Sequence, residues 1–329
     1  QPVGLVDDDA LKWGTSLHGV KVLGPTSRIG AVASDLEAEE IVIGIPSVDT
    51  DALRRIVEAC EGTGLPIKIL SGIKEVLEGT AVGSSNIRDI KVEDLLGRDP
   101  VRLELPALAE QLAGKTVLVT GAAGSIGSEL VRQLALHSPK CLILLDQAET
   151  PLFYLELEVL RREPAFRVVS IVGSVTDLDT VNRVVAEFRP DRVFHAAAYK
   201  HVPMMEHNRE EAVRTNVLGT FQIASAAAAG GAEAFILVST DKAVRPANVM
   251  GATKQMAERV VLNLQGVYPQ CSFGAVRFGN VLGSSGSVIP VFRRQLARGE
   301  PLTVPDRDVT RYFMTIPEAA QLVMQTGAM

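Results

Sequence analysis

The stretch Thr116-Val-Leu-Val-Thr120-Gly121-Ala-Ala-Gly124-Ser-Ile-Gly127 decides the fold, because an apolar strand runs directly into three glycines and then into a segment with helical apolar spacing. Glycines at this point permit a tight turn and let the backbone approach a pyrophosphate, which then lies at the helix N-terminus. The spacing is GxxGxxG, and alone it could be a turn that only lets a helix pack closely on a strand. The residues predicted to bind a dinucleotide here are Gly121, Gly124, Ser125, Ile126 and Gly127.

Three further strand ends support a dinucleotide site. Asp146 ends the next strand, 25 residues after Gly121, where a carboxylate can accept hydrogen bonds from a ribose 2′-hydroxyl. No arginine follows it immediately, so the sequence favours NAD over NADP. The small residues expected to line a flat ligand at the other strand ends are Ser174, Val175, Ala196, Ala197 and Ala198.

From residue 114 to residue 329, strands and helices alternate regularly. This alternation predicts an α/β fold with a doubly wound parallel sheet and helices on both faces. The expected strands are 116–120, 141–146, 166–172, 191–195, 233–239 and 272–277, and the expected helices are 125–137, 149–163, 177–188, 207–229, 249–266, 287–298 and 317–326. The last 45 residues are too few for a complete second lobe, so the substrate lobe is expected to be incomplete.

Residues 1–100 form a separate, smaller α/β domain in this interpretation. A strand at Glu40–Ile45, a helix at 49–60 and a strand at Ile67–Leu70 predict a βαβ unit. Ser47 or Asp49 is the candidate N-cap, and 20–23 is a possible further strand. A charged, proline-containing stretch from residue 87 onward leads into a connector at 101–113. No glycine-rich phosphate loop occurs in the first hundred residues, so we expect a regulatory, docking or assembly role.

Composition excludes several classes of protein. Among 329 residues the net charge is −6 and 47% are hydrophobic, which argues against nucleic-acid binding and against disorder. The three cysteines are scattered and no histidine or cysteine spacing fits a metal site, so we expect a reducing environment and no metal. No apolar run reaches the roughly 18–20 residues needed to span a bilayer.

A second group of reactive residues follows the fifth predicted strand. Thr240, Asp241 and Lys242 end this strand at the carboxyl edge of the sheet, while Met250 and Lys254 are four residues apart on the next helix and so share one face. The Asp-Lys pair could be a solvated surface ion pair, or an acid and a base in a partly buried site. Its position favours the acid and base.

These motifs together resemble the extended short-chain dehydrogenase/reductase superfamily, whose fold is Rossmann-like. More narrowly, the chain resembles the large membrane-anchored nucleotide-sugar 4,6-dehydratases of bacterial polysaccharide and glycan biosynthesis. The resemblance covers residues 115–329 through matching segments at 195–206, 216–220, 277–283 and 309–314. The first hundred residues resemble the soluble linker domain of these proteins. The resemblance implies a homo-oligomer and a parent protein anchored at the cytoplasmic side of the bacterial inner membrane.

The reaction implied by this resemblance is an internal redox reaction on a UDP-sugar. NAD takes a hydride from sugar C-4, water is lost across C-5 and C-6, and the hydride returns to C-6. Lys254 would hold the nicotinamide ribose and Thr240 the 4-hydroxyl. Asp241 would protonate the departing hydroxyl and Lys242 would remove the C-5 proton.

Position 250 distinguishes subfamilies, because most relatives carry a catalytic tyrosine there and methionine cannot transfer a proton. Thr-Asp-Lys with Met250 resembles the UDP-N-acetylglucosamine 4,6-dehydratases that retain configuration at C-5. By the same resemblance, Asn216 would contact the cofactor, and the residues expected to bind substrate are Lys200, Asn280, Arg293 and Arg311.

Two alternatives remain open. A UDP-sugar 4-epimerase needs the same hydride transfer but no Asp-Lys elimination pair. An NAD-binding sensor or scaffold would have lost its activity together with the tyrosine.

Overall fold

A computed structural model describes residues 1–45, 50–70, 87–89, 110–304, 306 and 308–328. The chain divides into two compact units, Gln1–Asp99 and Pro100–Met329. Most of the expected connector 101–113 lies outside the described residues. Its last part belongs to the second unit, because Leu112 is fully buried in that unit's core.

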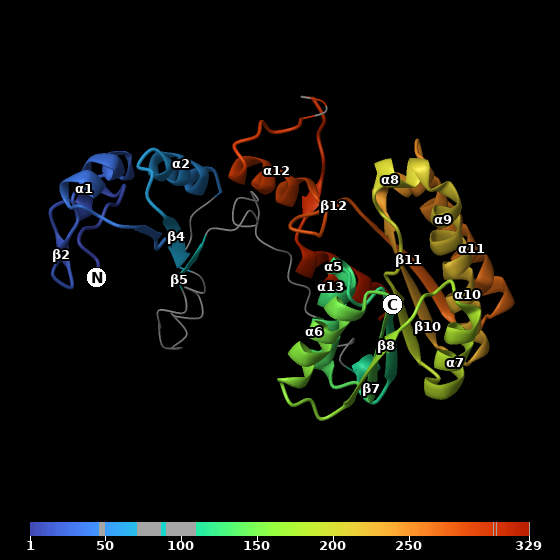
Figure 1. Cartoon of the computed structure of the whole chain (residues 1–329). Helices are drawn as coiled ribbons and strands as arrows, with labels where there is room; N and C mark the ends of the chain where they lie inside the picture. Colours follow the sequence, from blue (N-terminus) through green and yellow to red (C-terminus); the bar gives the residue numbers. More distant parts are fainter. Residues whose placement is uncertain (46–49, 71–86, 90–109, 305, 307, 329) are drawn as a thin grey trace. The chain divides into compact units, whose positions relative to one another are not determined.

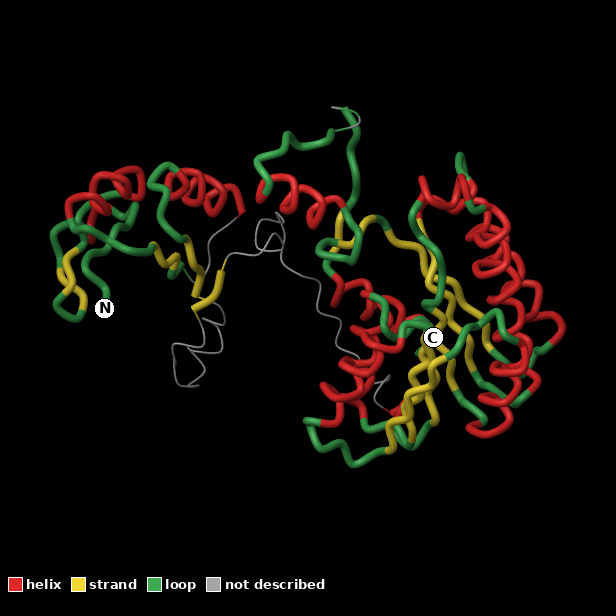
Figure 2. The backbone as a smooth tube through the Cα atoms, in the orientation of Figure 1, coloured by secondary structure: helices red, strands yellow, loops and turns green. Residues whose placement is uncertain are grey.

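The second unit is built on one sheet of six strands (Figure 2). The strands are β6 (Thr116–Thr120), β7 (Cys141–Asp146), β8 (Arg167–Val172), β9 (Arg192–His195), β10 (Ala234–Thr240) and β11 (Ser272–Phe278). Their order is β11-β10-β9-β6-β7-β8, and every neighbouring pair is parallel. The sheet order reverses between β6 and β9, which is where a doubly wound sheet binds its ligand. The prediction of a doubly wound parallel sheet is confirmed.

Strand side chains alternate between two hydrophobic layers because both faces of the sheet are covered. Leu118 of β6 and Phe235 of β10 belong to the layer under α7 (Leu178–Phe188), α10 (Thr220–Ala229) and α11 (Val249–Val267). Their chain neighbours Val117 and Ile236 belong to the opposite layer, under α5 (Ser125–Leu134), α6 (Glu149–Leu160) and α13 (Ile316–Thr326) (Figure 1). A 3₁₀ turn at Ala135–His137 extends α5.

The long helix expected at 207–229 is wrong, because this segment is broken into four parts. It starts earlier, at α8 (Val202–His207), where Pro203 occupies the first turn, and continues as α9 (Arg209–Val213). Asn208, with φ −129° and ψ 52°, interrupts the helical backbone between them. A π-helical turn at Arg214–Gly219 then leads into α10. Such turns frequently occur at functional sites.

The end of the chain contains the two expected helices, α12 (Val288–Ala297) and α13. It also contains a small parallel sheet that the sequence pattern did not predict, formed by β12 (Asn280–Val281) and β13 (Phe313–Met314). Asn280 and Phe313 are direct register partners in it. The pairing brings the segment around residue 311 back to the segment around residue 280.

In the first unit, the expected βαβ arrangement is confirmed. β3 (Ile41–Ile43), α2 (Thr50–Glu61) and β4 (Ile67–Leu70) follow one another, and the two strands pair in parallel. The candidate N-cap residues Ser47 and Asp49 lie outside the described residues. A small apolar cluster of Ile43, Leu53 and Val57 joins the helix to the sheet.

The rest of the first unit departs from expectation. Residues 87–89 form β5 (Ile87–Asp89), which pairs antiparallel with β4 and therefore does not start a connector. The strand expected at 20–23 is shorter, β2 (Val20–Lys21), and pairs antiparallel with β1 (Ser16–Leu17) in a separate sheet. The unit also contains α1 (Ile29–Asp35) and 3₁₀ turns at Ala10–Lys12 and Thr26–Arg28. Across the described residues of both units, no helix has the length and apolar character needed to cross a membrane.

Candidate active site

The turn between β6 and α5 requires glycine at two of its positions. Gly121 has a φ of +66°, and a Cβ added there would lie 2.5 Å from the backbone nitrogen of Ala197. A Cβ added at Gly127 would lie 2.0 Å from the carbonyl oxygen of Gly121. Gly124 is the N-cap of α5 and offers no side-chain cap, so the first-turn N–H groups remain available to an anion.

Asp146 holds this turn in place. One carboxylate oxygen accepts a hydrogen bond from the backbone N–H of Ala123 and the other from that of Ala148, both at 2.9 Å. The side chain thus links the glycine turn to the turn after β7. Each carboxylate oxygen retains further acceptor capacity, so its bond to a ribose hydroxyl stays a prediction.

A pocket opens at the carboxyl ends of β6, β7, β8 and β9. It brings together eight of the predicted cofactor residues with five others; its lining is Gly121, Gly124, Leu145, Asp146, Gln147, Gly173, Ser174, Val175, Ala196, Ala197, Ala198, Tyr199 and Thr215. Of the five, Gly173 precedes the predicted pair at 174–175, and four were not foreseen as site residues. Tyr199 directly continues the Ala196–Ala198 run, which could have indicated it, whereas nothing in the pattern marked Thr215.

Five predicted cofactor residues are not in this lining, namely Ser125, Ile126, Gly127, Asn216 and Lys254. Ile126 packs against the hydrophobic core beneath α5. The Ser125 hydroxyl accepts a 3.0 Å hydrogen bond from the Ser285 backbone N–H, so it holds the loop that precedes α12. Asn216 is fully buried on the π-helical turn.

The Asn216 side chain clamps the backbone of Tyr199. Its oxygen accepts from the Tyr199 N–H at 2.8 Å, and its nitrogen donates to the Tyr199 carbonyl at 3.0 Å. The same nitrogen donates to the Thr253 hydroxyl on α11 at 3.1 Å. We therefore assign Asn216 to the support behind the pocket wall. The π-helical turn is the local backbone form that aims this amide at Tyr199.

His195 at the end of β9 is a buried structural residue. Its Nδ1 lies 2.6 Å from the Thr120 hydroxyl and its Nε2 lies 2.9 Å from the Thr220 hydroxyl. Thr220 already donates its proton to the Asn216 carbonyl, so it accepts from Nε2–H and Nδ1 must accept from Thr120. Burial, and then the nearby Lys254 charge, lower the pKa of His195 to about 3. The ring is therefore neutral and has no role as an acid or base.

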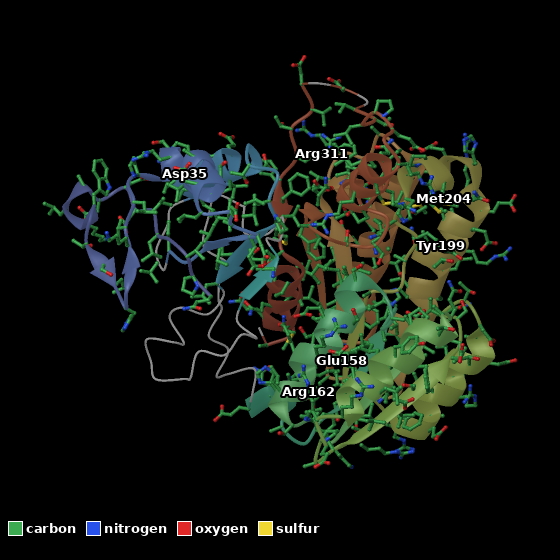
Figure 3. The ribbon with its side chains drawn as sticks, turned by 60° about the vertical axis from the view of Figure 1, so that its left-hand side comes forward. Asp35, Glu158, Arg162, Tyr199, Met204 and Arg311 are labelled. Atoms are coloured by element: carbon green, nitrogen blue, oxygen red, sulfur yellow. The ribbon has the colours of Figure 1, made fainter. Side chains whose placement is uncertain are left out.

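Met250 and Lys254 lie on α11, and both are buried. Met250 is in an apolar cluster with Met205 and Ala212, against which Tyr199 packs. Tyr199 precedes α8 and Met204 is an exposed residue of that helix (Figure 3). Met250 therefore packs in an apolar cluster and provides no titratable group at this position.

Lys254 is 5% exposed. Within the described part of the chain, its ammonium makes no hydrogen bond or ion pair to another side chain. Burial lowers its pKa to about 8, and the charge of Glu258 only partly opposes this effect. A buried cation without a partner is costly, which indicates a ligand group at this place.

Thr240, Asp241 and Lys242 come together with Asn280 in one cluster. The Asp241 carboxylate accepts from the Thr240 hydroxyl and from the Lys242 ammonium, each at 3.0 Å. The Lys242 ammonium also donates to the Asn280 side-chain oxygen at 3.2 Å. Asp241 and Lys242 lie on a 3₁₀ turn at Asp241–Ala243, whose N-cap Thr240 accepts a hydrogen bond from the Lys242 backbone N–H.

The charge state of this pair differs from the simplest sequence prediction. Burial raises the pKa of Asp241, but hydrogen bonds from Lys242 and Thr240 outweigh burial and leave the pKa below its ordinary value. Asp241 is therefore a carboxylate paired with an ammonium in this arrangement. A general acid at Asp241 needs a further change when substrate binds.

The remaining predicted substrate residues are exposed. Arg293 lies on the solvent side of α12, and Lys200 is exposed as a residue although burial around its ammonium lowers its pKa. Arg311 lies in the loop before β13, where it donates to the Thr310 carbonyl (Figure 3). Asn280 pairs with Phe313 in the β12–β13 sheet, and Arg311 is two residues before Phe313. Arg293 and Lys200 share no contact with each other in the structure.

These features fit an NAD-sized ligand. The uncapped α5 N-terminus suits a pyrophosphate, the Asp146 carboxylate suits a ribose, and the buried Lys254 ammonium suits a second polar group. Among the described residues, no three histidine, cysteine or carboxylate side chains are grouped to hold a metal ion.

Comparison with known proteins identifies relatives of the whole described site. The family model described as polysaccharide biosynthesis protein matches residues 117–329. The probable polysaccharide biosynthesis protein EpsC of Bacillus subtilis is 47% identical over 329 residues, which is 100% of this chain and 55% of the relative. The chain therefore spans about half the length of that protein.

Two further comparisons each cover about two thirds of the chain. A Campylobacter jejuni protein named UDP-N-acetylglucosamine 4,6-dehydratase (inverting) is 32% identical over 214 residues, covering 64% of this chain and 62% of that protein. The solved structure of Pen from Bacillus thuringiensis superposes with a TM-score of 0.62 at 34% identity, covering 66% of each chain.

Proposed function

Because this chain belongs to the polysaccharide biosynthesis protein family of extended short-chain dehydrogenases/reductases, we propose that it is an NAD-dependent UDP-N-acetylglucosamine 4,6-dehydratase. The observation that carries the proposal is the cluster of Thr240, Asp241, Lys242 and Asn280 at the carboxyl end of β10, the strand next to β9 in the same sheet. An oxidation at C-4 alone needs one acceptor for the hydroxyl proton and no acid–base pair. An elimination of water needs both an acid and a base.

The cofactor would be held along the carboxyl edge of the sheet. Its pyrophosphate would lie at the α5 N-terminus, one ribose would bind Asp146, and Lys254 would donate to the other ribose. When bound, NAD supplies the hydride acceptor for C-4 and the donor for C-6. These assignments are supported by the uncapped helix end and by the buried Lys254 ammonium, which has no side-chain partner among the described residues.

The Asp241–Lys242 pair can reach its active form by one proton transfer. In the ligand-free arrangement the pair is a carboxylate and an ammonium 3.0 Å apart. A bound sugar that excludes water disfavours both charges, and moving one proton from Lys242 to Asp241 neutralises both groups at once. The result is a carboxylic acid beside a neutral amine.

The neutral pair has the groups that elimination needs. The Lys242 amine removes the C-5 proton next to the 4-keto group, while the Asp241 carboxylic acid protonates the C-6 hydroxyl, which leaves as water. The pair is then an ammonium and a carboxylate. Lys242 returns a proton to C-5 when the hydride reaches C-6, and the proton that the 4-hydroxyl released on oxidation, passed through Thr240 to bound water, restores the Lys242 ammonium, so the protons balance over one cycle. Thr240 would hydrogen-bond the 4-hydroxyl, and Asn280 would orient Lys242.

The direct test is incubation of the protein with UDP-N-acetylglucosamine. A product lighter by one water supports the dehydratase, whereas an epimer of unchanged mass supports a UDP-sugar 4-epimerase. Running the reaction in heavy water and recording NMR spectra also reports exchange and configuration at C-5, where we expect retention because of Met250. If neither this chain nor a longer parent protein forms the lighter product, the proposal fails.

A sensor or scaffold without activity is distinguished by variants of the pair. Asp241→Asn and Lys242→Ala should abolish turnover and leave NAD binding intact, because neither residue lines the pocket. Lys140→Ala, at an exposed lysine outside the pocket lining, is the matched control for Lys242→Ala and should leave turnover within a few-fold. If wild type, Asp241→Asn and Lys242→Ala all show the same signalling activity in cells, the sensor hypothesis is supported.

We also propose that the chain forms a homo-oligomer and that its parent protein is anchored to the cytoplasmic face of a bacterial membrane. Leu218 on the π-helical turn, Phe221 on α10 and Leu262 on α11 are about half exposed, and α10 and α11 pack against each other. Light scattering of wild type and of Phe221→Asp tests the oligomer, since a charge in a shared apolar face should shift the mass toward the monomer.

A further inference from the structure

Glu258 is a buried carboxylate to which the proposed reaction assigns no role. It is 3% exposed and lies one helical turn after Lys254 on α11. Its carboxylate accepts a 2.5 Å hydrogen bond from the Ser239 hydroxyl. It also accepts two bonds from the Arg277 guanidinium, at 2.8 and 2.6 Å.

The two partners of Glu258 lie at the ends of the strands that lead to the reactive cluster. Ser239 of β10 and Arg277 of β11 are direct register partners. Ser239 is followed by Thr240, and Arg277 stands three residues before Asn280. The hydrogen bond from Lys242 to Asn280 also joins these two segments, beyond the ends of β10 and β11. Glu258 therefore ties α11, with its Lys254, to both segments that form the cluster.

Glu258 also supplies the negative charge near Lys254. The titratable groups that face this pair are Arg277 on β11 and His195 on β9, and His195 is neutral. Arg277 neutralises part of the Glu258 charge through its two hydrogen bonds. The pKa of Lys254 therefore depends on the charges of Glu258 and Arg277 as well as on its own burial.

We propose that Glu258 is a positioning residue that keeps the Lys254 ammonium charged for cofactor binding and fixes Thr240–Lys242 against Asn280. The second task rests on the proposed function; the first does not depend on the sugar reaction. Opposite unit charges one helical turn apart in a partly dry site change a proton affinity by about tenfold.

The test is the pH dependence of NAD affinity, measured by calorimetry between pH 6 and pH 9.5. Wild type should lose affinity with a midpoint near pH 8, as Lys254 releases its proton. In Glu258→Gln the midpoint should fall by about one pH unit. Ser239→Ala is the matched control, because it removes a hydrogen bond to the same carboxylate and leaves the charge in place. Its midpoint should not move.

Two more variants keep the proposal testable if Glu258→Gln folds poorly. Glu258→Asp should restore most of the wild-type midpoint, and Arg277→Met should move the midpoint upward, because it removes the cation that neutralises Glu258. A damaged fold would not produce opposite shifts. Equal midpoints in Glu258→Gln, Ser239→Ala and wild type would overturn the charge-setting role.

Turnover at pH 6, where Lys254 is about nine-tenths protonated or more in every variant, tests whether Glu258 fixes Thr240–Lys242 against Asn280. Glu258→Gln should lower kcat at least tenfold with a smaller change in KM for the sugar nucleotide, and an unchanged kcat would overturn this task. If the wild type binds NAD with the expected midpoint while neither it nor a longer parent protein converts the sugar nucleotide, the proposed function is refuted and the charge-setting role stands.

Discussion

Replacing Lys254 by methionine should stabilise the NAD-free protein at neutral pH while it removes most of the affinity for NAD. The ammonium is buried and has no side-chain partner among the described residues, and burial lowers its pKa from 10.5 to about 8. This difference corresponds to about 3 kcal/mol of unfavourable free energy for the charged folded state. Methionine keeps much of the aliphatic stem, so we expect the free energy of unfolding to rise by about 1–3 kcal/mol.

The sign of the pH dependence follows from the two proton affinities. Below pH 8 the folded and unfolded chains both carry the proton, and the full cost of the buried charge is present. Between pH 8 and pH 10.5 the folded chain has released the proton and the unfolded chain has not, so the cost decreases as the pH rises. The advantage of Lys254→Met should therefore shrink by about 2 kcal/mol between pH 7 and pH 9.5.

Urea unfolding of the NAD-free proteins at the two pH values, followed by circular dichroism, measures this advantage. Trp13 is the only tryptophan and belongs to the first unit, so its fluorescence separates the unfolding of that unit from that of the second. Lys140→Met, at an exposed lysine, is the control and should change stability by less than about 0.5 kcal/mol. A Lys254→Met protein that is less stable than wild type at pH 7 would refute the reasoning. So would a difference in free energy of unfolding between the two proteins that does not decrease between pH 7 and pH 9.5.

Gly127→Ala should destabilise the second unit by about 1–3 kcal/mol and weaken NAD binding, because the new Cβ would lie 2.0 Å from a carbonyl oxygen. The control is Gly266→Ala on α11, where a Cβ meets no atom within 4 Å. In thermal unfolding this control should stabilise the protein by about 0.5–1 kcal/mol. Met250→Tyr should not be needed for turnover, and a wild type that is inactive until given this tyrosine would contradict our assignment. Asp241→Asn should lower the rate of water loss at least a hundredfold in a mass-spectrometric assay, with NAD affinity within about twofold of wild type.

The fold of the second unit followed from the sequence because its signals are local. Each strand is an apolar run bounded by turn residues, and each helix that follows has its own apolar spacing. The exception is the segment after β9, where the spacing indicated one helix at 207–229. Proline at position 203 and the backbone turn at Asn208 are weak local signals, and the π-helical turn depends on the bonds of Asn216 to Tyr199 and Thr253, which no spacing rule contains.

The site residues also fall into two groups, those predictable from local sequence and those that depend on distant segments. The glycine turn, Asp146 and the run at 196–198 lie at strand ends, so topology alone brings them to one edge of the sheet. Arg293 and Lys200 were predicted by resemblance only, and their exposed side chains make no shared contact in the structure. Glu258 was missed because its role depends on Ser239 and Arg277, which are 19 residues away from it on either side.

By itself the sequence determined that this chain has a doubly wound sheet, a dinucleotide turn at Gly121–Gly127 and an Asp-Lys pair after β10, since each depends on residues that are adjacent or one element apart. Only the tertiary structure decided the charge states in the site. Asp241 is held as a carboxylate by Lys242, His195 is neutral between two threonines, and the buried Lys254 depends on Glu258. Charge state is set by burial and by partners from distant segments, and those exist only after the chain has folded.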